Sequence, residues 1–407
     1  MSAVTKRLGD IATVFNGKTP SKVEQRDVGF PVLKIRDVSE TGQFRGAFTS
    51  FVDEFMAKKH SARWVHSGDT LILNAAHNAD YVASKMFLAS DDVAGVLPTG
   101  EWLLVRPNVA EAIPEYLHYW IRSADTRKRI RFIVKGIHLY PKDVAELGVP
   151  WMPLSEQRRI VDILSRAEGI VRLRREAEKK AAELVPALFL DMFGDPATNP
   201  KGWPVAMLPD VLACPFKNGL YLPKEKYAPE GSSDGVEMVH MSDAFYGEVK
   251  RGRLRRVLAE EKQIRDYSLS KNDLLVARRS LTYDGAAKLC GIPASNEPLL
   301  FESSFIRLMP DSGKVRTEYL LYYLNDENTR RAHVLSRISG ITISGINQAA
   351  LNQIPVMIPP LSNQGNFVER VSEVRSIQSQ QSAATAIAQA TFEALLSQVF
   401  AKTKDMG

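Results

Sequence analysis

The feature that most constrains this chain is a short phrase that occurs twice. Pro-Leu-Ser-Glu-Gln occupies residues 153–157, and Pro-Leu-Ser-Asn-Gln occupies residues 360–364, which is 207 residues further on. Each copy follows an apolar segment punctuated by proline and precedes about forty residues without an obvious turn. Ser155 is a good N-cap, and Glu156 would oppose the helix dipole favourably, so the phrase predicts the start of a long helix. Two such starts predict two copies of one larger unit.

Other phrases repeat in the same order, at a spacing of roughly 200 to 207 residues. Solenoid repeats are about 20 to 50 residues long, so each copy is expected to be a whole domain followed by a helix. Short β-branched strands separated by turn clusters predict an α/β or α+β fold for each domain. The matching segments are 8–11 with 208–211, 67–73 with 271–276, and 114–120 with 317–323. The predicted boundaries are a first domain at 1–152, a helical segment at 153–195, a second domain at 196–359 and a second helical segment at 360–407.

Both predicted helices carry a row of mostly apolar residues at steps of three and four, which favours a coiled coil. Pro186 should kink the first helix or end its regular hydrogen bonding. Two antiparallel helices of about forty residues would span about 60 Å, or about 17 base pairs, and would hold the two domains at a fixed distance. The predicted rows are Ile163, Ala167, Ile170, Arg174, Ala177, Ala181, Leu184 and Leu188 in the first helix, and Val374, Ile377, Gln381, Ala384, Ala388, Thr391 and Leu395 in the second.

The two helices differ in charge. Residues 155–193 carry 15 charged side chains, whereas residues 361–400 carry only five. A long helix with so few charges is predicted to be buried against another helix or a partner protein, and the apolar rows are the candidate interface. An intramolecular hairpin without any partner is also compatible with this periodicity, because the periodicity does not identify what covers a helix face.

The composition is typical of globular protein, with 44% hydrophobic and 25% charged residues. The first residues lack the apolar stretch of a signal peptide, and no run of about 18 apolar residues occurs, so we expect a cytoplasmic protein. Cys214 and Cys290 are the only cysteines, which excludes a disulfide framework and a cysteine-rich zinc site. The net charge of +6 favours a polyanionic partner such as DNA, although it fits an ordinary basic protein equally well.

The sequence contains none of the motifs that we would expect of an enzyme acting on DNA. It has no Gly-x-x-x-x-Gly-Lys-Ser/Thr loop and no Gly-x-Gly-x-x-Gly motif, and Gly95 to Gly100 is interpreted as a turn. It has no His-Glu-x-x-His motif, so no metal site is predicted. An Asn-Pro-Pro-aromatic tetrad, expected of an amino-methyltransferase, is also missing. We therefore predict no catalytic residue and no cofactor bound by this chain.

Four repeated motifs together resemble the specificity subunit of type I restriction-modification systems. They are the Leu-Gly-Asp-Ile opening, the Ser-Gly-Asp-Thr-Leu-Ile strand, the Tyr-Leu helix and the phrase Pro-Leu-Ser-Glu-Gln-Arg-Arg-Ile. The resemblance implies two target recognition domains, each reading one half of a split double-stranded DNA target. It also implies two helical regions that pack as an antiparallel coiled coil and dock two modification subunits. Those partners would bind S-adenosylmethionine and methylate adenine, and restriction subunits would add cleavage driven by ATP with Mg. The second copy departs from the family pattern at Asn363 and at 365–367.

The recognition loops of this family are expected to vary, so we choose candidate DNA contacts by chemistry. Arginine and lysine suit phosphates and guanine, whereas asparagine and glutamine suit adenine. For each of them, a solvated surface side chain is the competing interpretation. Arg278 and Arg279 are the strongest choice, because they follow a predicted strand directly and precede a turn-rich loop. The candidates are Lys18, Thr19, Lys22, Asn74, His77, Asn78, Lys135 and His138 in the first domain, and Lys217, Lys224, Arg278, Arg279, Thr282, Tyr283 and Thr342 in the second.

The leading prediction is a non-catalytic DNA-recognition subunit that selects where partner enzymes act. A recognition subunit of a type II system with the same architecture differs only in its partner. A self-contained DNA-modifying enzyme would require an active site that the sequence does not display. A structural protein whose two domains bind other proteins is the remaining alternative, and the salt dependence of DNA binding would distinguish it.

Overall fold

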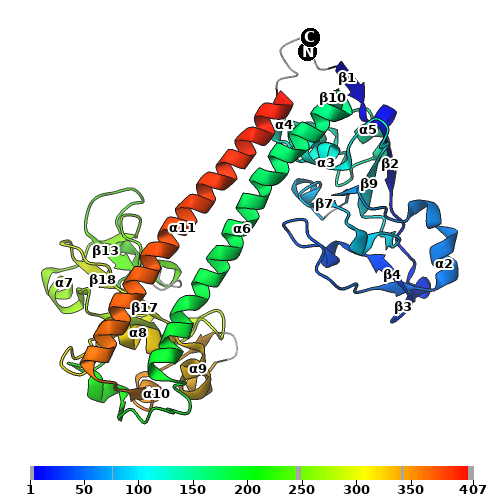
Figure 1. Cartoon of the computed structure of the whole chain (residues 1–407). Coiled ribbons are helices and arrows are strands. Elements are labelled where there is room, and N and C mark those ends of the chain that lie inside the picture. The colour runs from blue at the N-terminus through cyan, green and yellow to red at the C-terminus, as the bar shows by residue number, and fades with distance from the viewer. Residues whose placement is uncertain (1–3, 76, 244–248, 341–342, 402–407) are drawn as a thin grey trace. The chain divides into compact units, whose positions relative to one another are not determined.

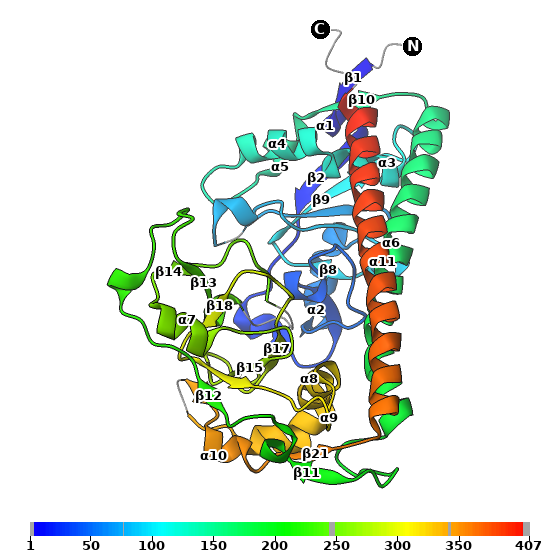
Figure 2. The same cartoon turned by 90° about the vertical axis from the view of Figure 1, so that its left-hand side faces the viewer.

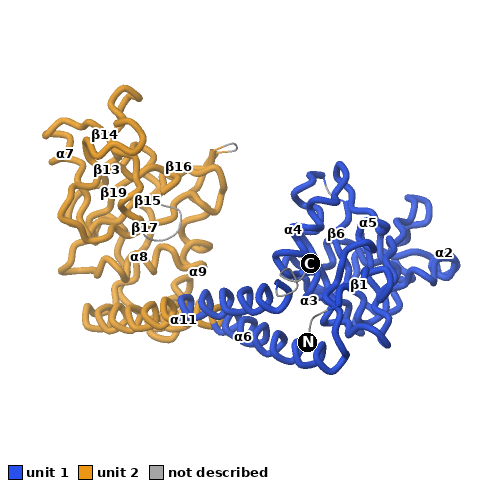
Figure 3. Tube along the Cα trace, turned by 90° about the horizontal axis from the view of Figure 1, so that it is seen from above, with its two compact units in different colours: residues 1–177, 381–407 blue, residues 178–380 orange. Residues whose placement is uncertain are grey.

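The computed structural model describes residues 4–75, 77–243, 249–340 and 343–401. It divides into two compact units, residues 1–177 with 381–407 and residues 178–380 (Figure 3). Each unit contains one copy of the repeated domain and part of each long helix, α6 (Leu154–Phe193) and α11 (Leu361–Ala401) (Figure 1). No helix within the described ranges is both long and apolar enough to cross a membrane.

The first unit is built on an antiparallel four-stranded sheet in the order β2-β9-β6-β7, of which Figure 2 shows β2 and β9 side by side. All four residues of β6 and the first four of β9 are buried, so the centre of this sheet is covered on both faces. A smaller sheet in the order β3-β5-β4-β8 includes the parallel pair β4 and β8, and β1 pairs with β10. The strands are β1 (Val4–Arg7), β2 (Ala12–Asn16), β3 (Gln25–Arg26), β4 (Phe30–Leu33), β5 (Phe51–Val52), β6 (Thr70–Leu73), β7 (Met86–Leu88), β8 (Leu97–Pro98), β9 (Trp102–Pro107) and β10 (Gly148–Trp151).

Short helices connect these strands. α3 starts with a proline in its first turn, where the missing N–H costs nothing, and it buries six consecutive residues from Tyr116 to Ile121. The helices of this unit before α6 are α1 (Leu8–Ile11), α2 (Glu54–Lys59), α3 (Pro114–Arg122), α4 (Ala124–Ile133) and α5 (Pro141–Ala145).

The second unit repeats this plan. Its central antiparallel sheet has the order β12-β19-β15-β17, which matches β2-β9-β6-β7 strand for strand. A second sheet, β14-β13-β18, again contains a parallel pair, so the predicted duplication of a mixed α and β domain is confirmed. The strands are β11 (Val205–Met207), β12 (Lys217–Asn218), β13 (Val236–Val239), β14 (Arg256–Val257), β15 (Leu274–Ala277), β16 (Arg279–Ser280), β17 (Leu289–Gly291), β18 (Leu299–Phe301), β19 (Phe305–Leu308), β20 (Ser344–Gly345) and β21 (Pro355–Met357); the helices are α7 (Glu261–Tyr267), α8 (Thr317–Asn325), α9 (Glu327–Thr329) and α10 (Gln348–Leu351).

The repeated phrase at 153–157 and 360–364 is explained by one buried glutamine in each copy. Gln157 has no exposed surface, and its Oε1 accepts from the Ile113 N–H at 2.8 Å while its Nε2 donates to two backbone carbonyls. Gln364 is equally buried, and its Oε1 accepts from the Arg316 N–H at 2.8 Å. Each glutamine therefore satisfies the loop that precedes α3 or α8 and ties the long helix to its domain.

α6 begins two residues earlier than an N-cap at Ser155 would require. α6 starts at Leu154, and the N–H groups of residues 156 and 157 donate to the Pro153 carbonyl. Ser155 therefore lies inside the first turn, and the prediction that it is the N-cap was wrong. Pro186 lies within α6, which continues to Phe193, so the proline does not end the helix.

At three predicted positions of α6, the buried residue is the next one along the chain. Leu164, Val171 and Val185 are buried, whereas Ile163, Ile170 and Leu184 are 42%, 51% and 48% exposed. Three more residues of the predicted rows are exposed, namely Ala177, Ile377 and Thr391. The other predicted residues are at least half-buried: Ala167, Arg174, Ala181, Leu188, Val374, Gln381, Ala384, Ala388 and Leu395. The reason is local: adjacent apolar pairs such as 163–164, 170–171 and 184–185 offer two rows with the same spacing, and the sequence pattern does not distinguish them.

Parts of both long helices complete the core of each unit. In the first unit, Leu164 and Val171 of α6 share a core with Phe392, Leu396 and Phe400 of α11. The Arg175 guanidinium also donates to the Gln389 amide oxygen at 3.0 Å. In the second unit, Phe189 and Phe193 of α6 pack with Phe367 of α11, with ring centroids 5.6 and 5.3 Å apart. Gln378 of α11 donates to the Ala181 carbonyl there at 2.7 Å.

Candidate nucleic-acid interface

A loop follows the central strand of each domain, and the two loops are held in the same way. Asn74 follows β6, and its N–H donates to the Glu101 carbonyl at 2.9 Å. Arg278 follows β15, and its N–H donates to the Ser304 carbonyl at 2.8 Å. The Asn74 carbonyl accepts from the Leu139 N–H and the Arg278 carbonyl from the Ile346 N–H, at 2.8 and 3.0 Å. Asn74 and Arg278, which were predicted separately, are thus structural counterparts.

The same unusual backbone conformation closes both loops. Ala83 and Ala287 each have φ of 59°, and their N–H groups donate at 2.8 Å to the carbonyls of Leu73 and Ala277. A left-handed conformation costs a residue other than glycine roughly 1–2 kcal/mol. Its presence at equivalent positions in both copies shows that the loops at 74–82 and 278–286 have a defined closure onto the strands they leave.

Asn74 supports the first loop from inside and is not available to contact a base. It is only 4% exposed, and its Nδ2 donates to the Asn16 side chain and to the Gly100 carbonyl, both at 3.0 Å. Gly100 in turn donates its N–H to the Thr19 hydroxyl at 2.9 Å. The amide of Asn74 therefore fixes the loop that carries Lys18 and Thr19 beside the loop after β6, and its predicted role as a DNA contact is corrected to a positioning role.

The remaining candidates of the first domain are exposed, and several lie around this loop. His138 pairs with Ala75 across an isolated β-bridge and with Lys135 across a tight turn at Gly136, whose φ of 63° suits glycine. Lys135 also forms an ion pair with Asp143 at 2.6 Å. The other exposed candidates are Lys18, Lys22, His77 and Asn78, and the side chain of Asn78 accepts from the Asp80 N–H.

In the second domain, the candidates that follow β15 lie together. Arg279 is exposed and pairs with Gly345 in the two-stranded sheet of β16 and β20. The side chain of Arg278 is half-buried. Within the same loop, the Thr282 hydroxyl accepts from the Gly285 N–H at 3.2 Å. The Tyr283 hydroxyl donates to the Leu335 carbonyl at 2.6 Å, which fixes the tip of the loop against the 3-10 helix Leu335–Arg337.

Two lysines and one threonine of the predicted set have other surroundings. The Lys217 ammonium lies 4.3 Å from the ring centroid of Tyr267 and donates to the Asp266 carbonyl, so it is engaged within the domain. Lys224 is exposed in a short 3-10 helix at 224–226. Thr342 lies outside the described residues.

A cationic group beside the loop of Lys18 was missed. Arg63 donates to the carbonyls of Asn16 and Gly17 at 2.7 and 3.0 Å, which places its charge beside the loop of Lys18. Burial, together with the nearby cations Lys18, Lys59 and Arg63, lowers the pKa of His60. The signal was present in the sequence as a cluster of basic residues from 58 to 63, but it lies outside the glycine-rich loops on which the prediction concentrated.

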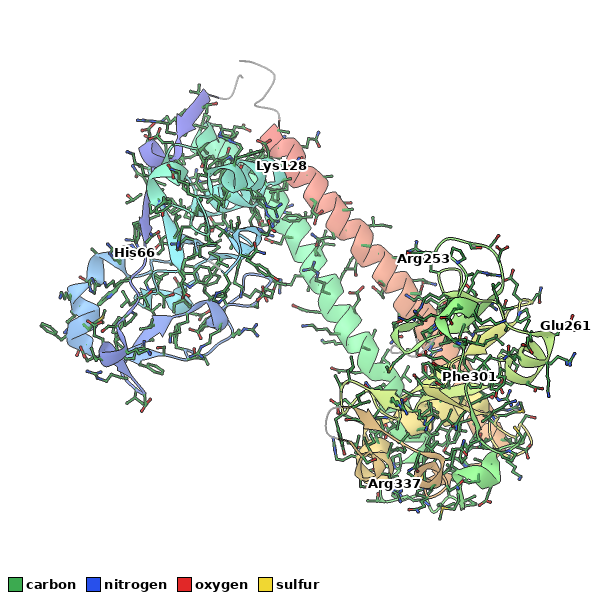
Figure 4. All side chains as sticks on the ribbon, turned by 180° about the vertical axis from the view of Figure 1, so that it is seen from behind. His66, Lys128, Arg253, Glu261, Phe301 and Arg337 are labelled. Carbon is green, nitrogen blue, oxygen red and sulfur yellow. The ribbon has the colours of Figure 1, made fainter. Side chains whose placement is uncertain are left out.

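The aspartate of the repeated Gly-Asp or Asn-Asp turn is structural. Asp69 is 1% exposed, accepts from the Arg106 guanidinium at 2.7 Å and also accepts from the N–H of His66, a residue labelled in Figure 4. Asp273 accepts from the Ser270 N–H at 2.8 Å, and burial raises its pKa. Among residues 4–75, 77–243, 249–340 and 343–401, no three His, Cys, Asp or Glu side chains form a group that could hold a metal ion.

Comparison with known proteins identifies the family. The family described as the type I restriction modification DNA specificity domain matches residues 2–183 and again residues 200–386. This chain belongs to that family. The two matched ranges agree with the duplication seen in the sheets, and each includes one of the two loops described above.

Relatives of this specificity-domain chain are distant in sequence. The specificity subunit of the type I restriction enzyme StySPI from Salmonella potsdam is 25% identical over 281 residues, which cover 64% of this chain and 58% of that subunit. The EcoBI specificity subunit from Escherichia coli is 22% identical over 396 residues, covering 90% of this chain and 78% of the subunit. A chain from a solved structure of type I restriction-modification complex assembly aligns with a TM-score of 0.63 at 20% identity, over 98% of this chain and 97% of its own, which shows a common fold.

Proposed function

We propose that this chain is the DNA-recognition subunit of a type I restriction-modification complex and that each domain reads one half of a bipartite, asymmetric target. The observation that carries the proposal is the repeated loop after β6 and β15. In both copies it is closed by the same strained alanine, and in both it presents exposed polar or basic side chains beside a second loop. Loops that close in the same way and carry side chains of this chemistry suit contacts to phosphates and base edges.

The long helices support a spacing role. α6 has 40 residues and α11 has 41, so each would extend for about 60 Å, equivalent to about 17 base pairs. We infer that they form one antiparallel coiled coil, which would fix the separation of the two half-sites. The hydrogen bonds from Arg175 to Gln389 and from Gln378 to Ala181 support this pairing within each unit.

The exposed apolar side chains of the helices support docking of two modification subunits. Ile163, Ile170 and Leu184 of α6 and Ile377 of α11 come from the predicted interface and face solvent instead of the cores. Apolar side chains that recur on one exposed helical surface are typical of a partner interface. Adenine methylation and cleavage would then be carried out by partner subunits, which would bind S-adenosylmethionine, ATP and Mg, and the complex would act in the cytoplasm.

Mapping of methylated adenines tests the proposal. A host that carries this gene together with the gene for its modification subunit should methylate two short half-sites separated by a fixed gap, and deletion of this gene should abolish that methylation. An unchanged pattern in an otherwise active system would refute the specificity role. The subunits that co-purify with the chain would distinguish a type I complex from a type II enzyme, and methylation or cleavage by the purified chain alone would favour a self-contained enzyme.

A further inference from the structure

The first domain carries a strongly cationic helix face next to its candidate interface. α4 (Ala124–Ile133) buries Thr126 and Ile130, so Arg127, Lys128 and Arg131 lie on its exposed surface. Lys128 is labelled on this helix in Figure 4. The segment 127–135 contains five lysines and arginines and no aspartate or glutamate. This short segment alone carries a charge of +5, whereas the whole chain of 407 residues has a net charge of only +6.

Within the described ranges, the side chains of the three exposed cations of α4 make no ion pair that would stabilise the fold. Among the residues that the structure describes, none forms an ion pair with Arg127, Lys128 or Arg131. Their neighbours differ in this respect: Arg129 donates to the Gly148 carbonyl at 3.1 Å, and Arg122 pairs with Glu168 at 2.6 Å. Like charges three and four residues apart on a helix repel one another, and Asp125 in the first turn is the only acidic residue of α4, so the excess of positive charge reduces helix stability. An anionic partner would relieve that repulsion.

The position of α4 connects these cations to the loop after β6. Only Val134 separates α4 from Lys135, which begins the tight turn to His138. His138 pairs with Ala75 of the loop, and the Leu139 N–H donates to the Asn74 carbonyl. The cationic face of α4 therefore continues directly into the part of the domain that carries the candidate base contacts.

The second domain lacks an equivalent face. The corresponding segment contains Arg330, Arg331 and Arg337. Arg330 is 6% exposed and donates to the carbonyls of Asp284 and Ala286, both at 2.9 Å. Arg337 donates to backbone carbonyls, and Arg331 lies 3.9 Å from Glu327. The arginines of this segment stabilise the domain, so the exposed cationic face is specific to the first copy.

We propose that Arg127, Lys128 and Arg131 bind backbone phosphates of the DNA that flanks the first half-site. The inference rests on the proposed function and adds to it a phosphate-binding surface that neither the motif pattern nor the repeat indicates. Contacts of this kind position a duplex without reading its sequence. The first half-site is accordingly held through more phosphate contacts than the second.

The test measures the affinity of the full-length chain for duplex DNA as a function of salt, with Arg127, Lys128 and Arg131 all changed to alanine. Three lost phosphate contacts reduce the slope of log affinity against log salt by about 2.7, from about 0.9 per contact. Between 50 and 200 mM salt, the decrease in affinity should then be about 40-fold smaller than for the unchanged chain. The effect should be equal on the methylated target and on a scrambled duplex, because phosphates carry no sequence information.

Two variants serve as controls. Changing Arg158, Arg159 and Arg166 to alanine removes the same charge from exposed positions on α6 and should leave the slope unchanged. Changing Arg127 and Arg131 to lysine keeps the charge and should preserve the slope. An unchanged slope in the α4 triple variant, or an equal loss in the α6 triple variant, would overturn the inference while leaving DNA recognition intact. Absence of DNA binding by the unchanged chain would overturn the proposed function itself.

Discussion

Replacing Gln157 by leucine should destabilise the first unit far more than a surface substitution nearby. The side chain has no exposed surface and makes three hydrogen bonds, to the Ile113 N–H and to the carbonyls of Glu111 and Met152. Leucine has a similar volume but removes this partner from all three part-buried backbone groups, of which the Glu111 carbonyl keeps a second donor in Trp151 Nε1 at 3.2 Å. At about 1–3 kcal/mol for an unsatisfied buried group, with some relaxation, the expected loss is about 3 to 5 kcal/mol in the free energy of unfolding.

Urea unfolding followed by tryptophan fluorescence measures this loss, because Trp64, Trp102, Trp120 and Trp151 all belong to the first unit. Ser155→Ala is the matched control, since Ser155 is exposed in the same helical turn and should change the free energy by less than about 0.5 kcal/mol. A loss below about 1 kcal/mol for Gln157→Leu would refute the explanation given for the repeated phrase.

Three further predictions concern other parts of the domains. Burial lowers the pKa of His118 to about 3, so between pH 7 and pH 5 the imidazole takes up a proton in the unfolded chain but stays neutral in the folded one. The free energy of unfolding should therefore fall by about 2 kcal/mol from pH 7 to pH 5. The substitution His118→Asn should remove that part of the pH dependence. Ala83→Gly should stabilise the chain by roughly 0.5–1 kcal/mol in thermal unfolding because of its positive φ, whereas Ala94→Gly, at φ of −67°, should destabilise it. Changing Arg278 and Arg279 to alanine should weaken binding to the second half-site by about tenfold or more, and unchanged affinity at moderate salt would contradict their assignment.

The duplication and the two long helices were predictable because they depend on periodicity, which the sequence displays directly. The repeated phrase at Gln157 and Gln364 marks a point where one side chain must satisfy three backbone groups, and few residues other than glutamine can do so. The repeated aspartate at Asp69 and Asp273 reflects a similar local requirement, a buried carboxylate that closes a turn.

Properties that depend on which segments meet in space were not predictable. Asn74 looked like a base contact until strand pairing brought Asn16 and Gly100 to its amide. The sequence does not predict whether Ile163 or Leu164 of α6 packs into the core, because both are apolar. Only the surface that the helix meets in the structure distinguishes them. The cations of α4 were overlooked because their importance depends on which side chains pair with them, and only the structure shows that Arg127, Lys128 and Arg131 form no ion pair with another described residue.

The sharing of α11 between the units also has a consequence for the order in which the chain folds during synthesis. The core of the first unit includes Phe392, Leu396 and Phe400, which are translated more than two hundred residues after Val171 in the same core. At about 5–20 residues per second, the ribosome needs roughly 10 to 40 s to cover that interval. Throughout it, the apolar surface of Tyr116 and its neighbours lacks its final cover. The domain that is made first therefore completes its core only after the domain that is made second has been synthesised.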